Sequence, residues 1–242
     1  MRSLIIMLIC LFSMPTFADS NTPMAKMNDE VKGILEKASK AVRTDLVKDA
    51  KSMLQTANMT IANMGIKGTV KVSLKADKIR IESQTADILE VNGFDGKGAW
   101  SENITTGLRM LDGAEKLNLI AETLPFTFSP EKFYDSIELM GKTTFDNKEC
   151  YKIKFSKKGM DPVIEFYDMK TFLALGEERV IPNPMGKMKA VTVYGNYVKH
   201  EKGFLYPATM IQSMGPVKVE VKVTGIKLNV EMDDKIFAVP AQ

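Results

Sequence analysis

The sequence has very little of the histidine and cysteine that enzymes often use for acid–base, nucleophilic or metal chemistry. Among its 242 residues are one histidine and two cysteines, and it contains no HExxH motif and no paired CxxC motif. A zinc site needs about three or four His, Cys or carboxylate ligands. The composition therefore argues against a zinc centre, and we expect neither a metal nor a cofactor.

Neither the single histidine nor the adjacent carboxylate pairs mark a catalytic residue. His200 lies in the charged turn Lys199-His200-Glu201-Lys202-Gly203. A general base needs a substrate pocket and a partner, so we interpret this histidine as a solvated hairpin residue. The carboxylates of the adjacent pairs Glu177-Glu178 and Asp233-Asp234 would point to opposite faces of a strand, and we expect them at the solvated surface. The phosphate loop and the nucleophile elbow are both absent.

The first 18 residues combine little charge with a short apolar run. Arg2 precedes nine apolar residues, Leu4 to Phe12, and Thr16-Phe17-Ala18 offers small residues where a signal peptidase reads them. Nine residues cannot span a bilayer, which needs about 20. We therefore expect residues 1–18 to be a cleaved signal peptide and residues 19–242 to form one periplasmic domain without a transmembrane segment.

Cleavage at that point leaves little cysteine and little net charge. Cys10 falls in the signal peptide, so Cys150 alone remains and no intramolecular disulfide forms. We expect Cys150 to be a buried structural thiol, as free cysteines usually are. Without Arg2, 32 basic residues face 30 acidic ones. This balance gives no electrostatic reason to expect nucleic acid as a partner.

The sequence is rich in strands with one apolar and one charged face. In residues 217–223, valines alternate with Lys218, Glu220 and Lys222. Because successive side chains of a strand point to opposite faces, this strand has one dry face and one wet face. Similar alternation recurs in residues 69–75 and 150–156, and ordinary hairpin turns separate the segments. We count ten or eleven strands.

Two segments have helical spacing. Residues 28–42 place Val31, Ile34 and Val42 on one stripe after an acidic start, and residues 113–123 form a second helix that Pro125 ends. Two helices are too few for a parallel α/β fold. The sequence therefore predicts an α+β, mainly antiparallel fold, in which a strongly curved sheet has helices packed on its concave face. Phe126 and Phe128 lie in a loop that we expect to cover an apolar surface.

Several short motifs resemble those of the outer-membrane lipoprotein-sorting superfamily, the LolA/LolB-like proteins. Gly93-Phe94-Asp95-Gly96-Lys97-Gly98-Ala99-Trp100 is similar to a turn of its uncharacterised branch. The later elements that fit the same order are Gly141 with Cys150-Tyr151-Lys152-Ile153, Phe166-Tyr167-Asp168, Tyr197 with Pro207, and Leu228-Asn229 with Phe237 and Pro240. The likeness extends from Asn28 to Pro240.

The resemblance implies an unclosed β-barrel of about eleven strands, covered by helices, that holds an apolar cavity. Members carry or sense lipoprotein acyl chains and bring no catalytic residue. The carriers also use a cavity arginine, whose position no motif marks here. The candidate lining residues are Met59, Val70, Val72, Leu74, Ile79, Ile81, Ile153, Phe155, Val191, Val193, Met210, Val219 and Val221. The candidate lid residues are Leu117, Ile120, Leu124, Phe126 and Phe128. Ordinary core is the alternative role for each of them.

Three functions remain open at this point. The leading hypothesis is a non-enzymatic carrier or binding protein for an acyl lipid or lipoprotein. Its narrower form adds a membrane-associated protein partner and a role in outer-membrane lipoprotein sorting. Methionine favours the leading hypothesis, since 14 of the 17 remain after Met1, Met7 and Met14 are removed, and this side chain adapts to irregular apolar surfaces. One alternative is a sensor or adaptor module that uses this same fold to bind a protein partner. The other is a hydrolase with two converging carboxylates.

Overall fold

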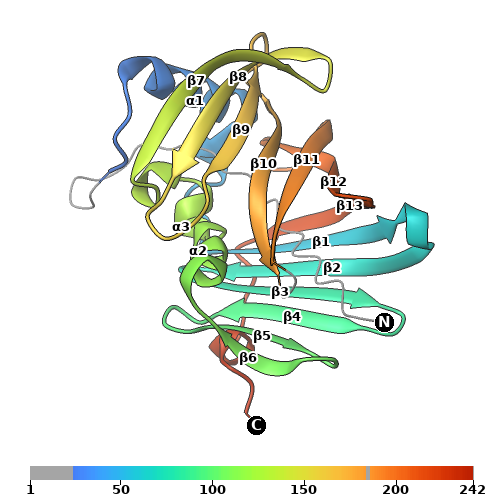
Figure 1. The fold of residues 1–242 in the computed structure, drawn as a ribbon. Helices are drawn as coiled ribbons and strands as arrows, with labels where there is room; N and C mark the ends of the chain where they lie inside the picture. Colours follow the sequence, from blue (N-terminus) through green and yellow to red (C-terminus); the bar gives the residue numbers. More distant parts are fainter. Residues whose placement is uncertain (1–23, 184–185, 242) are drawn as a thin grey trace.

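One antiparallel sheet of thirteen strands forms the body of the protein, as the computed structural model shows (Figure 1). The structure describes residues 24–183 and 186–241, so the predicted signal peptide, residues 1–18, lies outside the described residues. The strand order is β6-β5-β4-β3-β2-β1-β13-β12-β11-β10-β9-β8-β7. Because β6 and β7 stand at opposite ends of this order, the sheet is unclosed, and the predicted fold class is confirmed.

The strands are mostly long, and each pairs with its neighbours in the order given. Their bounds are β1 (Ser52–Ile61), β2 (Ile66–Lys75), β3 (Lys78–Thr85), β4 (Leu89–Phe94), β5 (Ala99–Asn103), β6 (Gly107–Leu111), β7 (Ser136–Phe145), β8 (Lys148–Ser156), β9 (Val163–Asp168), β10 (Ala174–Asn183), β11 (Gly186–Lys199), β12 (Leu205–Met214) and β13 (Val217–Leu228). The sequence predicted about eleven. It missed β6, because residues 106–112 have the composition of a turn.

Helix α1 (Asp29–Val42) begins and ends as its sequence predicts. The Asn28 side chain accepts a hydrogen bond from the Val31 N–H at 2.9 Å, and Asp29 and Glu30 lie in the first turn, near the positive end of the helix dipole. Arg43 ends the helix in the left-handed conformation. The buried stripe packs on β7, β8 and β9 through Ile137, Ile153, Phe155 and Val163.

A short roof connects the two halves of the sheet. It consists of α2 (Gly113–Ala121), α3 (Leu124–Thr127) and the 3-10 turn η3 (Pro130–Lys132). The prediction that Pro125 ends the first of these helices was wrong. Helix α2 stops at Ala121, and Pro125 lies in the first turn of α3, where its missing N–H costs nothing. Phe126 is therefore helical, and Phe128 caps α3.

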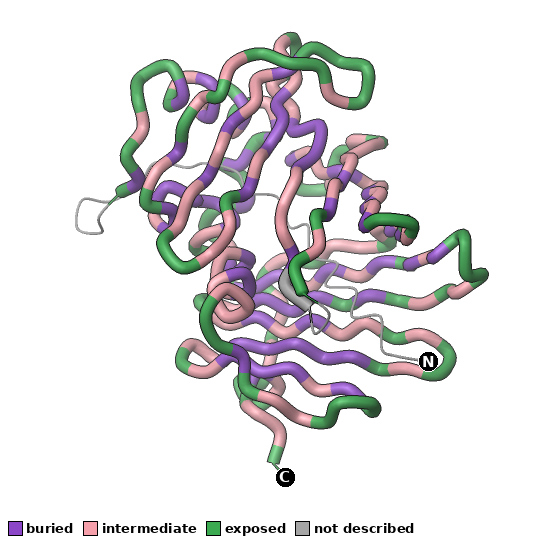
Figure 2. The backbone as a smooth tube through the Cα atoms, in the orientation of Figure 1, coloured by how far each residue is buried: buried purple, intermediate pink, exposed green. Residues whose placement is uncertain are grey.

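The inner face of the sheet is the face that α1 and the roof cover. Directly opposed residues lie on the same face, so its composition follows from the strand register. One crosswise row runs Ile61–Val219–Gln212–Thr192–Glu177–Glu165–Ile153. Figure 2 shows buried and half-buried residues alternating along many strands, as expected when one face is covered. The inner face is thus continuous from β1 through β13 to β8.

The outer face has a smaller core of its own around the single tryptophan. Trp100 is fully buried, and its indole N–H donates to the Phe237 carbonyl at 3.1 Å. Phe237 belongs to the C-terminal 3-10 turn η4 (Asp234–Phe237), which crosses the sheet to reach this site. A Cβ atom at Gly93 would lie 2.4 Å from the indole ring. Glycine at this position therefore makes room for the tryptophan.

Candidate functional site

Most of the predicted lining and lid residues come together on the inner face, in two apolar clusters. The larger cluster contains Met59, Val70, Val72, Leu74, Ile79, Ile81, Met210, Val219, Val221, Leu124 and Phe128. Ile153 and Phe155 belong to the other cluster, and Leu117 and Phe126 pack against it. Ile120 packs against both clusters, so it lies where they meet. These placements are consistent with either a ligand trough or a protein core.

Two of the predicted lining residues lie elsewhere. Val191 and Val193 are half-buried, whereas Ala190 and Thr192 on the same strand are buried. Because side chains alternate along β11, the two valines point to the outer face. The strand has apolar residues on both faces, with Tyr194 packed on the inner side, so sequence alternation alone did not show which face is covered.

An apolar cavity of about 40 Å³ lies between the end of α1, the roof and strands β1, β12 and β13. Its walls include Val42, Met53, Phe128, Phe204, Met210 and Val223. Met210 and Phe128 are the predicted site residues among its lining. Pockets for small-molecule ligands usually measure about 300–1,000 Å³. The cavity in this structure is therefore too small for an acyl chain unless its walls move apart.

A polar belt interrupts the apolar inner face at the middle of the crosswise row. Gln212, Thr192, Glu177 and Glu165 are all buried and follow one another across β12, β11, β10 and β9. The Gln212 side chain donates to the Thr192 hydroxyl at 3.3 Å, and Tyr167 donates to a Glu165 carboxyl oxygen. Burial is the main cause that raises the Tyr167 pKa, so this tyrosine remains a donor at neutral pH.

Arg179 is the cation of this belt. Its guanidinium lies 2.6 Å from Glu177 on the same strand and 3.0 Å from Glu122, which caps the end of α2. Both carboxylate side chains are buried and Arg179 is half-buried, with 15 % of Arg179, 3 % of Glu177 and 6 % of Glu122 exposed. An ion pair is worth more in such a site than at the surface, because water screens it less. Arg179 thus links the sheet to the roof.

The prediction that Glu177 is a solvated surface residue was wrong. The pair does split across the strand as expected, but Glu177 faces inward, and it is Glu178 that lies outward, 3.0 Å from Lys189. The sequence offered one signal that could have been used, the spacing of Glu177 and Arg179 two residues apart on one strand face. Paired charges are the usual way to bury a carboxylate.

His200 lies in a hairpin turn, as predicted, but it is half-buried and not fully solvated. Its ring stacks on Phe204 at a centroid distance of 4.4 Å, and Nε2 lies 3.0 Å from the Ile226 carbonyl. Phe204 and Ile226 both line the apolar cavity. The histidine therefore supports the cavity wall, and no described carboxylate pairs with it to make it a base.

The described residues, 24–183 and 186–241, contain neither a metal-binding cluster nor a membrane-spanning helix. No group of three or more His, Cys, Asp or Glu side chains in these ranges is placed to hold a metal ion. No helix in the same ranges is both long enough and apolar enough to cross a membrane.

Comparison with solved structures identifies the architecture. A LolA superfamily protein from Nitrosomonas europaea superposes with a TM-score of 0.57 at 14% identity, over 86% of this chain and 97% of that chain. The fold is LolA-like. A DUF1329 family protein from Desulfovibrio piger gives a TM-score of 0.56 at 14% identity, over 87% of this chain and 98% of that chain.

Another LolA-like structure carries a functional description. A putative outer membrane lipoprotein-sorting protein domain from Vibrio parahaemolyticus superposes with a TM-score of 0.51 at 12% identity, covering 84% of this chain and 96% of that one. No family model matches the sequence, and no curated protein matches it. The similarity therefore establishes a shared LolA-like fold over most of the chain.

The structure also explains the glycine-rich turn at residues 93–100. The Asp95 carboxylate accepts hydrogen bonds from the Lys97 and Gly98 N–H groups at 2.9 and 2.8 Å, and Gly96 has a φ of +94°. Together with Gly93, this turn positions Trp100 beneath the C-terminal turn. The motif therefore has a structural role on the outer face, far along the sheet order from the apolar cavity.

Sequence reasoning missed most of the cavity wall. Val42, Val47, Phe204 and Ile226 line the cavity of this LolA-like fold but were not among the predicted site residues. One usable signal was the apolar run Phe204-Leu205-Tyr206-Pro207, which directly follows a charged turn. Leu119, the fully buried residue of α2, was also missed, although Leu117 and Ile120 on either side were chosen.

Proposed function

We propose that the protein is a periplasmic, non-enzymatic carrier or binding protein for acyl lipids or lipoproteins. The observation that carries this proposal is the inner face, which has an apolar cluster on each half of a LolA-like sheet and is covered in part by short helices. Burying one CH₂ group is worth about 0.8 kcal/mol, so an apolar lining alone can hold an acyl chain. A role in outer-membrane lipoprotein sorting is the narrower form of the proposal.

Carriage of an acyl chain requires the cavity to widen. In the described structure the lining leaves about 40 Å³, so a bound chain must displace side chains or the roof itself. Met53 and Met210 line the cavity and have flexible thioether side chains that can repack around a guest. Helix α3 has only four residues, too few to hold its position without tertiary contacts.

Lipid retention can be tested on protein purified from the periplasm without detergent. Native mass spectrometry and lipid extraction are expected to find an acyl species bound to the wild-type protein. Met210→Trp, which fills the cavity, is expected to lose that species. Ile211→Trp, which places the same ring on the outer face next to Val193, is the matched control and is expected to keep it. Circular dichroism checks that both variants fold.

The proposal fails if the wild-type protein never carries lipid and does not take up added acyl chains. The small cavity then favours a second candidate, a sensor or adaptor with a permanently packed interior. Such a module would bind a single protein in fixed stoichiometry, and the complex would survive delipidation. Co-purification of that complex, followed by mass measurement of the intact assembly, distinguishes the two candidates.

A further inference from the structure

Two hollows meet at one side chain, Phe128. The inner hollow is the apolar cavity of about 40 Å³, and Phe128 forms part of its wall. The outer hollow, on the other side of the same residue, measures about 290 Å³ and is open to solvent. Its lining includes Lys48, Asp49, Leu124, Pro125, Phe128 and Lys132. The Phe128 side chain is buried and lines both hollows, so it lies between the inner cavity and the accessible surface.

Hydrogen bonds near Phe128 hold α3 in place without involving the phenyl ring. The Thr127 hydroxyl donates to the carbonyls of Glu122 and Thr123 at 3.1 and 3.0 Å, which ties α3 to the end of α2. The Phe128 N–H reaches the Leu124 carbonyl only at 3.4 Å, a long hydrogen bond. Rotation of one side chain would therefore join the hollows without unfolding α3.

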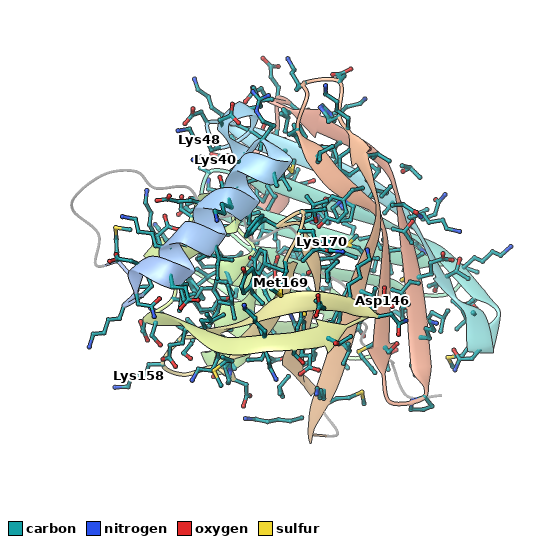
Figure 3. The ribbon with its side chains drawn as sticks, turned by 90° about the horizontal axis from the view of Figure 1, so that it is seen from above. Lys40, Lys48, Asp146, Lys158, Met169 and Lys170 are labelled. Carbon is teal, nitrogen blue, oxygen red and sulfur yellow. The ribbon has the colours of Figure 1, made fainter. Side chains whose placement is uncertain are left out.

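The rim of the outer hollow carries an excess of positive charge. Lys48 and Lys132 line it, and neither forms a salt bridge within residues 24–183 and 186–241. Asp49 is the single acid in the lining. Figure 3 shows Lys48 at the periphery near one end of α1. The floor of the hollow is apolar, formed by Ala50, Leu124, Pro125 and Phe128.

We propose that the outer hollow is the entrance and head-group site for a single-chain amphiphile with an anionic head. The head lies between Lys48 and Lys132, and the tail passes Phe128 into the inner cavity. An apolar floor with a basic rim fits this class of molecule, because each part of the ligand meets a surface of matching polarity. The inference rests on the proposed function and deepens it, since it names the ligand class and the route.

The head-group part is tested with two amphiphiles of equal chain length and opposite charge. Sodium dodecanoate and dodecyltrimethylammonium bromide are titrated below their critical micelle concentrations by isothermal titration calorimetry. We expect the anion to bind more tightly. Lys48→Glu with Lys132→Glu is expected to weaken dodecanoate about fivefold per lysine, the factor that about 1 kcal/mol gives. Lys142→Glu, an exposed lysine on β7, is the matched control and is expected to change nothing.

The gate part is tested by the rate of uptake. Phe128→Ala is expected to speed dodecanoate association, and Phe128→Trp to slow it, in stopped-flow measurements. Phe133→Ala removes a buried ring from the same segment that lines neither hollow, so it is expected to lower stability without changing the association rate.

The outcomes separate this inference from the proposed function. Equal binding of both amphiphiles, or no effect of the two lysine changes, overturns the entrance even if native lipid is extracted. Uptake unaffected by either Phe128 variant overturns the gate. If wild-type protein binds neither probe but carries an extracted lipid, the ligand class is wrong and carriage stands. If it binds nothing and carries nothing, both proposals fail together.

Discussion

Arg179 on β10 and Glu122 at the end of α2 join the roof to the sheet, with Nη1 3.0 Å from Oε1. The two residues are 57 positions apart in the chain and come together in the buried polar belt. Glu177 holds the other side of the same guanidinium at 2.6 Å. Any movement of α2 away from the sheet has to break the first of these contacts.

We predict that Arg179→Met destabilises the protein by about 3–5 kcal/mol, because it leaves buried carboxylates without a counter-ion. Urea unfolding followed by circular dichroism measures the loss. The double variant Arg179→Met, Glu122→Gln should recover part of it, since one of the orphaned charges is removed. Arg43→Met breaks the exposed pair with Asp45, which solvent screens, and should cost far less. Equal losses in the two single variants would contradict the predicted difference.

We predict that stability falls as the pH rises toward neutrality, because of Glu131. This side chain is fully buried, and neither carboxyl oxygen has a hydrogen-bond partner among the described residues. Burial raises its pKa to about 7. The folded state therefore holds the proton more tightly than the unfolded state, in which the pKa is near 4.5. The stabilisation is complete below about pH 4.5 and is lost as the pH rises to about 7.

The expected loss from Glu131 over that interval is roughly 3 kcal/mol, since each pKa unit corresponds to about 1.4 kcal/mol. Thermal unfolding at a series of pH values from 4.5 to 8 measures it. Glu131→Gln should flatten the profile in this interval, whereas Glu149→Gln at an exposed site on β8 should retain the wild-type profile. A wild-type profile unchanged by Glu131→Gln would show that another group is responsible.

We predict opposite effects from two glycine-to-alanine substitutions. At Gly93 the new methyl group would lie 2.4 Å from the Trp100 indole, so overpacking should cost about 1–3 kcal/mol and shift the tryptophan fluorescence. Gly33 lies within α1 and has no atom within 4 Å of an added Cβ, so alanine should stabilise the helix by about 0.5–1 kcal/mol. Chemical unfolding of both variants, with Trp100 emission as the probe, checks the signs.

We predict that two valine-to-alanine substitutions separate the inner face from the outer face. Val219 on β13 is fully buried in the larger apolar cluster, so Val219→Ala should cost about 1.5–3 kcal/mol. Val191 is half-buried on the outer face, and Val191→Ala should cost less than about 1 kcal/mol. Equal costs, measured by urea unfolding, would mean that β11 presents its other face inward.

Alternation in the sequence was enough to predict a mainly antiparallel, curved sheet, and helical spacing predicted the extent of α1. That the sheet is unclosed was implied by the family resemblance. Alternation identifies faces well where one face is charged, as at Val219 and Val221 against Lys218, Glu220 and Lys222. It fails on β11, where Val191 and Val193 alternate with Thr192 and Tyr194, because packing from outside the strand decides which set is covered.

The polar belt and the cavity were only partly signalled by the sequence, for a different reason. Arg179 neutralises Glu177 from two residues away on the same strand, but the second carboxylate that Arg179 pairs with, Glu122, lies 57 residues away and leaves no local pattern. The cavity wall likewise combines Val42 from a helix end with Phe204 from a hairpin and Val223 from β13. Such sites depend on how elements meet, which periodicity within one element does not encode.

The strand order also bears on how the protein is made. The sheet is continuous only because β1 pairs with β13, and the Ser52 hydroxyl donates to the Val230 carbonyl, 178 residues later in the chain. As the polypeptide emerges from its N-terminus, β1 to β6 can assemble early, yet one edge of β1 stays bare until nearly the whole chain has appeared. Bare strand edges invite pairing with other molecules. A newborn chain of this topology therefore passes through a long interval in which it depends on dilution or on a chaperone to avoid aggregation.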